Sequence, residues 1–271
     1  MKKLTTFLFI LWFGIIFSQT HRFIYELQMK WGDETEKMNM VLDIDKDFVK
    51  FYDYDFLVYD SISKKTGEHH QTGSISEQLI LRKANTFENK HFLFGGFDYF
   101  VIETKDKINW KLEPETKNVE EYHLQKAITD YGERHWTAWF CTEIPFQEGP
   151  YKFRGLPGLI FELSDDKNDF EYSLIKSKNL PKTFDTTDFL ETYYGESPIK
   201  VSLKQYHKKM IEHYNNPFVE PKEALKRGAI IKIDGKQITS PEQFDQKRKQ
   251  TQERTKKYYN PIELDKAIPY P

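Results

Sequence analysis

The sequence has 271 residues, a formal net charge of −2, 16% aromatic and 30% charged residues, and one cysteine. A charge so close to neutral gives no long-range attraction to nucleic acid, and a single cysteine excludes an intramolecular disulfide. The abundance of Phe and Tyr favours strands. We therefore expect a mainly β protein whose core is built by burial rather than by disulfides.

The first eighteen residues have the pattern of a signal peptide. Lys2 and Lys3 precede an apolar run, residues 7–17, and Ser18 suits a cleavage site. The run is shorter than the roughly 20 residues that span a bilayer, so we expect no transmembrane helix in the mature chain. A retained N-terminal anchor is the alternative. The prediction is export to the periplasm or the extracellular space, with residues 19–271 forming a single domain.

Residues 23–177 predict an antiparallel sheet. Apolar residues alternate with mostly polar ones over residues 23–29 and 38–44, the period of a strand with one buried face. Further short strands follow to residue 112, and about four more lie between residues 122 and 175. Polar turns such as 165–168 join neighbouring strands. Residues 63–73 look like a loop. This pattern indicates one curved sheet, a half-barrel or open barrel.

Residues 200–258 change to a helical and basic pattern. Ser202 and Gln205 form a capping-box signature, and Asn216-Pro217 ends that helix. A second helix is expected from Ser240 to about Tyr258. Residues 222–257 carry an excess of six positive charges, which indicates either a solvated helix or a surface that contacts an anionic partner. The fold class is thus mainly β (α+β), with about two helices in the C-terminal third.

A constrained turn stands at the centre of the sequence. Pro157 fixes φ for one turn position and Gly158 can take a positive φ at the next, which predicts a type II turn followed by a buried strand. The motif consists of Gly155, Leu156, Pro157, Gly158, Leu159 and Ile160. It is interpreted either as a turn that the fold requires or as the rim of a cavity or partner-binding edge.

This segment resembles the GLPGLI family of exported Bacteroidota proteins, a family of unknown function. Besides the motif, the resemblance rests on residues 125–127, Arg134, residues 138–139, 144–145 and 149–150, and more weakly on residues 260–262. One departure is Leu124, where members of the family often have a cysteine. The resemblance implies an envelope or secreted protein and assigns no activity.

The sequence indicates no catalytic residues, no metal site and no cofactor. The nucleophile-elbow, phosphate-loop and zinc-helix motifs are absent from it. His69 and His70 are adjacent in a polar segment, and His207 and His213 are about 240° apart on a helix. The acidic pairs at 120–121 and 165–166 are expected to be surface or turn residues. The protein is therefore predicted to be non-enzymatic rather than an enzyme.

An aromatic group around the motif is the candidate ligand site. Trp139, Phe146, Tyr151 and Phe153 lie in a segment that Pro145, Gly149 and Pro150 interrupt, and such a group forms either core or the lining of an apolar pocket. The favoured function is binding of an apolar small molecule or an envelope protein partner by the curved sheet. The alternatives are a secreted hydrolase whose site is assembled only in space, and a structural accessory of an outer-membrane assembly.

Overall fold

The structure is a computed structural model that describes residues 20–96, 98–233 and 235–271; the predicted signal peptide, residues 1–18, lies outside them. Within these residues, twelve strands form one sheet in the order β12-β6-β5-β4-β3-β2-β1-β11-β10-β9-β8-β7. Neighbouring strands in this order pair antiparallel, except that the short β12 pairs parallel with β6. The strand bounds are β1 Thr20–Trp31, β2 Glu34–Ile44, β3 Phe48–Asp53, β4 Leu79–Lys83, β5 Glu88–Gly95, β6 Asp98–Lys105, β7 Lys111–Val119, β8 Tyr122–Tyr131, β9 Arg134–Cys141, β10 Leu159–Asp165, β11 Phe170–Leu180 and β12 Ile199–Lys200.

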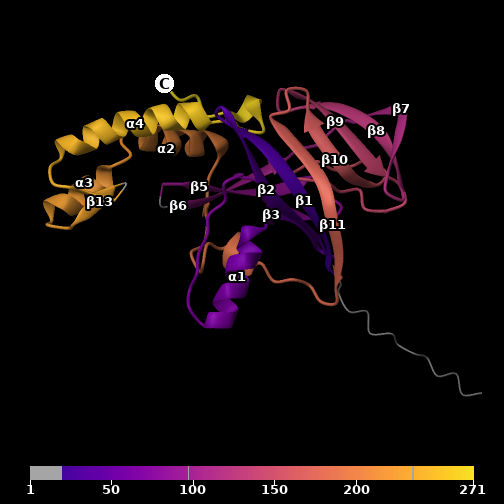
Figure 1. Cartoon of the computed structure of the whole chain (residues 1–271), viewed down its shortest axis with the longest axis horizontal. Coiled ribbons are helices and arrows are strands. Elements are labelled where there is room, and N and C mark those ends of the chain that lie inside the picture. Colours follow the sequence, from indigo (N-terminus) through magenta and orange to yellow (C-terminus); the bar gives the residue numbers. More distant parts are fainter. Residues whose placement is uncertain (1–19, 97, 234) are drawn as a thin grey trace, which may run out of the picture.

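The sheet curls strongly, as the link between β6 and β7 requires. These strands lie near opposite ends of the sheet, where ten strand spacings would separate them by roughly 48 Å if the sheet were flat. Residues 106–110 alone join them, and such a link spans at most about 20 Å. The predicted curved antiparallel sheet is therefore confirmed. It stays open, because the described edge strands β7 and β12 do not pair with each other (Figure 1).

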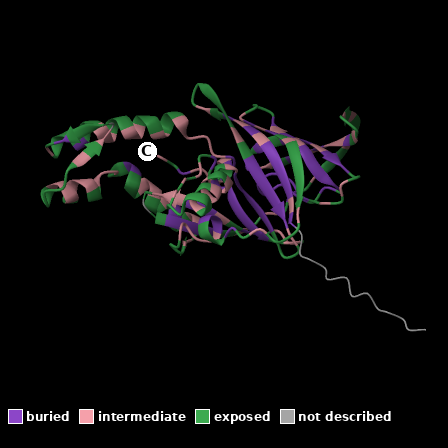
Figure 2. Cartoon of the chain, turned by 60° about the horizontal axis from the view of Figure 1, so that its bottom comes forward, coloured by how far each residue is buried: buried purple, intermediate pink, exposed green. Residues whose placement is uncertain are grey.

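The inner face of the sheet is filled over β8–β11 and β1 by the β9–β10 connection, residues 142–158. Phe153 is fully buried and packs on Trp136 of β9 at a ring-centroid distance of 4.6 Å. From the same connection Glu148 forms a buried ion pair with Arg82 of β4. The connection thus contacts strands from both halves of the sheet and forms part of the main core. Figure 2 shows the buried residues concentrated along the strands.

The glycines of the motif are required for a different reason from the predicted one. The positive φ, +99°, belongs to Gly155, whereas Gly158 is not among the residues with positive φ, so the predicted left-handed residue at Gly158 is wrong. A Cβ at Gly158 would lie 2.0 Å from the carbonyl oxygen of Cys141. Gly158 is therefore needed because β9 and β10 approach each other closely at the start of their pairing, where Leu159 faces Cys141.

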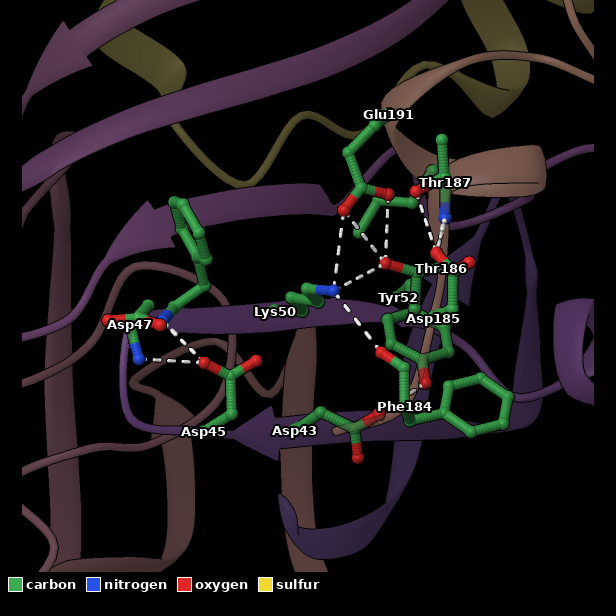
Figure 3. Close-up of polar contacts among 12 residues, drawn as sticks. Asp43, Asp45, Asp47, Lys50, Tyr52, Phe184, Asp185, Thr186, Thr187 and Glu191 are labelled. Carbon is green, nitrogen blue, oxygen red and sulfur yellow. Dashed lines mark hydrogen bonds and ion pairs between the residues drawn. The ribbon is translucent and has the colours of Figure 1, made fainter. Parts of the chain in front are cut away.

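The outer face of β2–β6 is covered by α1 (Asp55–Thr66) and by a π-helical turn, η1 (Thr187–Glu191). Lys50 of β3 anchors the second of these: its Nζ donates to Thr186 Oγ1 at 2.8 Å and lies 3.3 Å from Glu191 Oε1 (Figure 3). The helix α1 was missed in the sequence, where residues 63–73 were predicted to be a loop. Phe56 is its buried residue, so it has no periodic apolar face to detect.

The C-terminal third contains the predicted helices and one more. α2 (Leu203–Asn215) begins at Ser202, whose side chain and that of Gln205 form the predicted capping box. α4 (Glu242–Tyr258) confirms the second helix. Between them lie α3 (Val219–Lys226) and a small hairpin of β13 (Ile231–Ile233) and β14 (Lys236–Ile238), and a short 3₁₀ turn, η2 (Leu264–Lys266), follows. Among the described helices, none is both long and apolar enough to cross a membrane.

Candidate functional site

A cavity of about 480 Å³ lies between the inner face of the sheet and the C-terminal part of the chain. One wall comes from β1, β5 and β6, and the other from α2, α4 and residues 259–270. The two helices lie side by side, and Gln252 Nε2 of α4 donates to the carbonyl of Tyr214 in α2 at 2.9 Å (Figure 1). We call this space the central cavity.

Much of the lining of the central cavity is apolar. Trp31 at the end of β1 stacks on Tyr258 at the end of α4, with ring centroids 5.6 Å apart and planes at 30°. This pair closes the wall between strand and helix. The remaining apolar side chains of the lining are Met29, Ile75, Leu93, Ile102, Leu203, Met210, Pro261, Ile262 and Ile268.

A buried ion-pair network borders the cavity. Glu263 Oε1 accepts hydrogen bonds of 2.5 Å from Tyr151 Oη and from Lys152 Nζ, and Glu263 also pairs with Lys266. Lys266 Nζ reaches Asp106 Oδ1 at 2.8 Å, in the connection between β6 and β7. Burial opposes ionisation of Glu263, but the two lysines outweigh it and lower its pKa to about 2. This network joins the C-terminal tail to the β9–β10 connection. Its two carboxylates and two lysines balance in charge.

Glu77 is the carboxyl group of the lining without such partners. It lies in the turn before β4, with a left-handed backbone (φ +54°). Its backbone nitrogen donates to Ser74 Oγ at 3.0 Å, but no hydrogen bond or ion pair joins its carboxyl group to any residue in the described part of the chain. Glu77 lines the cavity and is exposed, yet the protein atoms around its carboxyl group desolvate it and raise its pKa to about 7.

His91 of β5 fixes the turn that carries Glu77. Its Nε2 lies 2.8 Å from the carbonyl oxygen of Glu77, which can only accept, so Nε2 carries the proton. Burial, helped by the charge of Lys152, lowers the pKa of His91 to about 4. The imidazole is therefore neutral at pH 7, and its ring packs edge-on against Tyr151. His91 acts here as a positioning residue.

The structure does not bring the four candidate ligand residues together. Tyr151 lines the central cavity with its buried ring. Phe153 lies in the core. Phe146 is half-buried against His21 and Phe23. Trp139 lies on the opposite face of β9 from Trp136, where Lys117 Nζ lies 4.5 Å from its ring centroid.

The motif residues, 155–160, do not line the central cavity. Leu156, Leu159 and Ile160 are buried in the core, and Gly155 and Pro157 are exposed. Other residues of the resemblance meet in space: Arg134 donates to Asn260 Oδ1 at 2.8 Å and to the carbonyl of Pro261 at 3.0 Å. Through these bonds the start of β9 holds the segment that forms one wall of the central cavity.

Glu77 was missed by sequence reasoning, and no motif could have found it. It belongs to a turn, residues 74–78, which becomes part of the cavity wall only when α2 and the C-terminal tail pack over it. Metal ligands are a separate case: in the described residues, no group of three or more His, Cys, Asp and Glu side chains is placed to hold a metal ion.

These features define a mainly β protein with a curved, open antiparallel sheet and a helix-covered cavity. Residues 129–162, which include β9 and the motif, match the sequence model of a protein family of unknown function, Porph_ging. No match was found among curated proteins.

Two solved structures of PNGF-II, in space groups C2 and P2₁, are similar in fold. Their TM-scores are 0.51 and 0.52, at 15% and 13% sequence identity. In each case 71% of this chain is covered, against 32% and 33% of the PNGF-II chain. The chain thus spans about a third of the length of these structures, and at this identity the likeness concerns the fold alone.

Proposed function

We propose that the protein binds an amphipathic small molecule in the central cavity. The observation that carries this proposal is the combination of an apolar lining with one unpaired carboxyl group, Glu77, on the wall. Small-molecule sites typically have volumes of about 300–1,000 Å³, mostly apolar walls and a few convergent polar groups. The central cavity, at about 480 Å³, has these properties.

The apolar walls supply the affinity in this proposal. Each methylene group that leaves water for such a surface contributes about 0.8 kcal/mol, so a chain of several carbons offsets the cost of immobilising the ligand. The polar groups of the ion-pair network are already satisfied by one another and can border the cavity without a ligand. Of the four candidate aromatic residues, Tyr151 has the position that this proposal requires.

The cellular setting is part of the same proposal. The charged and apolar start of the sequence and the resemblance to the GLPGLI family support an exported protein, located in the periplasm or outside the cell. We propose membership of that family, with residues 19–271 acting as one domain. A protein partner from the envelope is the second class of ligand, for which the basic residues between 222 and 257 are the charged surface.

A hydrolase is a second candidate function, because of the pKa of Glu77. A carboxyl group with a pKa of about 7 can act as a general acid at neutral pH. The nearby Glu263 is engaged by Tyr151 and two lysines, which leaves it unsuited to serve as a partner nucleophile. Turnover of a glycan, peptide or ester panel that disappears in Glu77→Gln would favour this function over binding alone.

The binding proposal is tested by filling the cavity from α4. Thr255 lines the central cavity, whereas Gln250 on the same helix is exposed and does not. We expect the neutral fluorescent probe N-phenyl-1-naphthylamine to bind the wild-type protein and Gln250→Trp alike, and to bind Thr255→Trp at least about tenfold more weakly, a loss of about 1.4 kcal/mol. Equal binding by both variants, or no binding by the wild type, contradicts the proposal.

A further inference from the structure

The position of Glu77 narrows the chemical class of the ligand. We infer that the central cavity takes an amphiphile with a cationic head group, an alkylammonium or quaternary ammonium, and that Glu77 binds this head group. The inference rests on the proposed function, since it concerns the same cavity. It follows from three features of the lining: the unpaired carboxyl group, the tyrosine rings in the same cavity and the pairing of both lysines with other carboxylates.

The carboxyl group is held in place without being used. Hydrogen bonds to the backbone of Glu77, from His91 and to Ser74, fix the turn, while the side chain itself has no polar partner among the described residues. A left-handed φ at a residue other than glycine costs free energy and persists where the surroundings enforce it. The fold therefore directs an uncompensated negative charge toward the cavity.

Three tyrosines share the cavity with this charge. Tyr206 of α2 and Tyr259 and Tyr270 of the tail line the same cavity. Burial raises the pKa of each, and the charge of Glu77 adds to the effect, so the carboxyl group acts electrostatically on all three.

The hydroxyl groups of two of these tyrosines bond elsewhere. Tyr206 Oη donates to the carbonyl of Phe94 at 3.1 Å, and Tyr259 Oη accepts from the nitrogen of Ile268 at 2.5 Å. Tyr259 and Tyr270 pack edge to face. Aromatic faces beside a carboxylate are the surroundings that stabilise an organic cation.

The other charges of the lining do not occupy Glu77. Lys152 and Lys266 are paired with Glu263 and Asp106. Arg254 of α4 also lines the cavity, but no ion pair joins it to Glu77 in the described residues, and burial raises the pKa of Glu77. A bound cation would supply the missing positive charge, whereas an anionic head group would meet a like charge.

The charge state of Glu77 makes this inference sensitive to pH. A permanent cation favours the ionised carboxylate, so its binding should tighten as pH rises through about 7. A ligand that accepts a hydrogen bond from the protonated acid should show the opposite trend. The titratable and charged groups that line the cavity with Glu77 are His91 of β5, Tyr151 and Lys152 of the β9–β10 connection, Tyr206 and His207 of α2, Arg254 and Tyr258 of α4, and Tyr259, Glu263, Lys266 and Tyr270 of the tail.

The test compares amphiphiles that share one decyl chain: decyltrimethylammonium, decanol and decanoate. Calorimetric titration of the whole protein at pH 8 should show decyltrimethylammonium binding about tenfold more tightly than decanol, and decanoate more weakly than either. The advantage of the cation should shrink at pH 6. Glu77→Gln should abolish the advantage, and Glu121→Gln, at an exposed turn, should retain it.

The outcomes separate the inference from the proposed function. Equal binding of cation and alcohol, tightest binding of decanoate, or an unchanged preference in Glu77→Gln would overturn the inference while leaving the binding function intact. Absence of binding by all three amphiphiles would overturn both. The pH series on the unmodified protein, repeated on His207→Asn to remove that imidazole, tests the inference even if Glu77→Gln does not fold.

Discussion

The inner face of the sheet is covered in two ways. Over β8–β11 and β1 the chain fills it with its own β9–β10 connection, whose Phe153 is 0% exposed. Over β5 and β6 the cover consists of α2, α4 and the C-terminal tail, and the central cavity remains. One sheet therefore carries both a packed core and a cavity.

The difference follows from the residues that each cover offers. The inner connection brings Tyr151, Phe153 and Leu156, all buried, on a backbone that glycine and proline allow to fold tightly. α4 has one buried residue, Phe244, which lies at the far end of the helix from the tail. A helix with so few apolar side chains can roof a cavity but cannot fill it.

The largest effect is expected at Gly158. In Gly158→Ala the new methyl group would lie 2.0 Å from the carbonyl oxygen of Cys141, and the contacted atoms are backbone, which cannot move aside as a flexible side chain could. We expect a loss above about 4 kcal/mol, or no folded protein. Gly73→Ala is the matched control, because its Cβ meets nothing within 4 Å. Thermal unfolding of both variants checks this, and similar melting temperatures would contradict the close approach.

Phe153→Ala should cost slightly less, about 3–5 kcal/mol, as for other buried Phe residues. Its ring contacts Trp136, Tyr131 and Trp110, and the loop cannot collapse into the space left behind. Phe48→Ala, at a side chain that is 42% exposed, is the control. Urea unfolding measures both. A small loss that came with weaker binding of N-phenyl-1-naphthylamine would place Phe153 at a binding site instead of in the core.

Glu263 lies between the packed core and the central cavity, and it should make the stability of the folded protein sensitive to acid. Its pKa in the folded protein is about 2, below the ordinary 4.5, so its contribution to stability is present above about pH 4.5 and is lost as pH falls toward 2. This contribution is at most about 3 kcal/mol. Glu263→Gln should flatten the dependence of unfolding free energy on pH in that window. An unchanged acid limb would show that the pairing with Lys152 does not stabilise the fold.

Glu77 should change the stability with pH in the opposite direction, and by the smallest amount. Its pKa is raised from 4.5 to about 7, so the folded state binds more protons than the unfolded state between these values, and stability falls as pH rises through them. Glu77→Gln should therefore gain in melting temperature relative to wild type from pH 5 to pH 8. A constant difference across this range would mean that the carboxyl group is paired or fully hydrated.

The sequence was sufficient for the elements that obey a local rule. Alternating apolar residues located the long strands, and the Ser202 and Gln205 box located α2 to the residue. It was insufficient for α1, whose burial depends on a single phenylalanine, and for Gly158, whose role depends on the neighbouring strand. The central cavity depends on still longer separations: Glu77 and Tyr270 lie almost two hundred residues apart in the chain. No local sequence pattern predicts that two such residues line the same cavity.

The central claim, that the helix-covered half of the sheet is a binding cavity, is tested most directly by locating a ligand. A crystal of the protein soaked with 10-bromodecanol would reveal the bromine by its anomalous scattering. We expect a peak between α2, α4 and the inner face of β5 and β6, beside Leu93 and Met210. A peak on the outer face near Trp139, or an empty cavity at a saturating concentration of the alcohol, would contradict it.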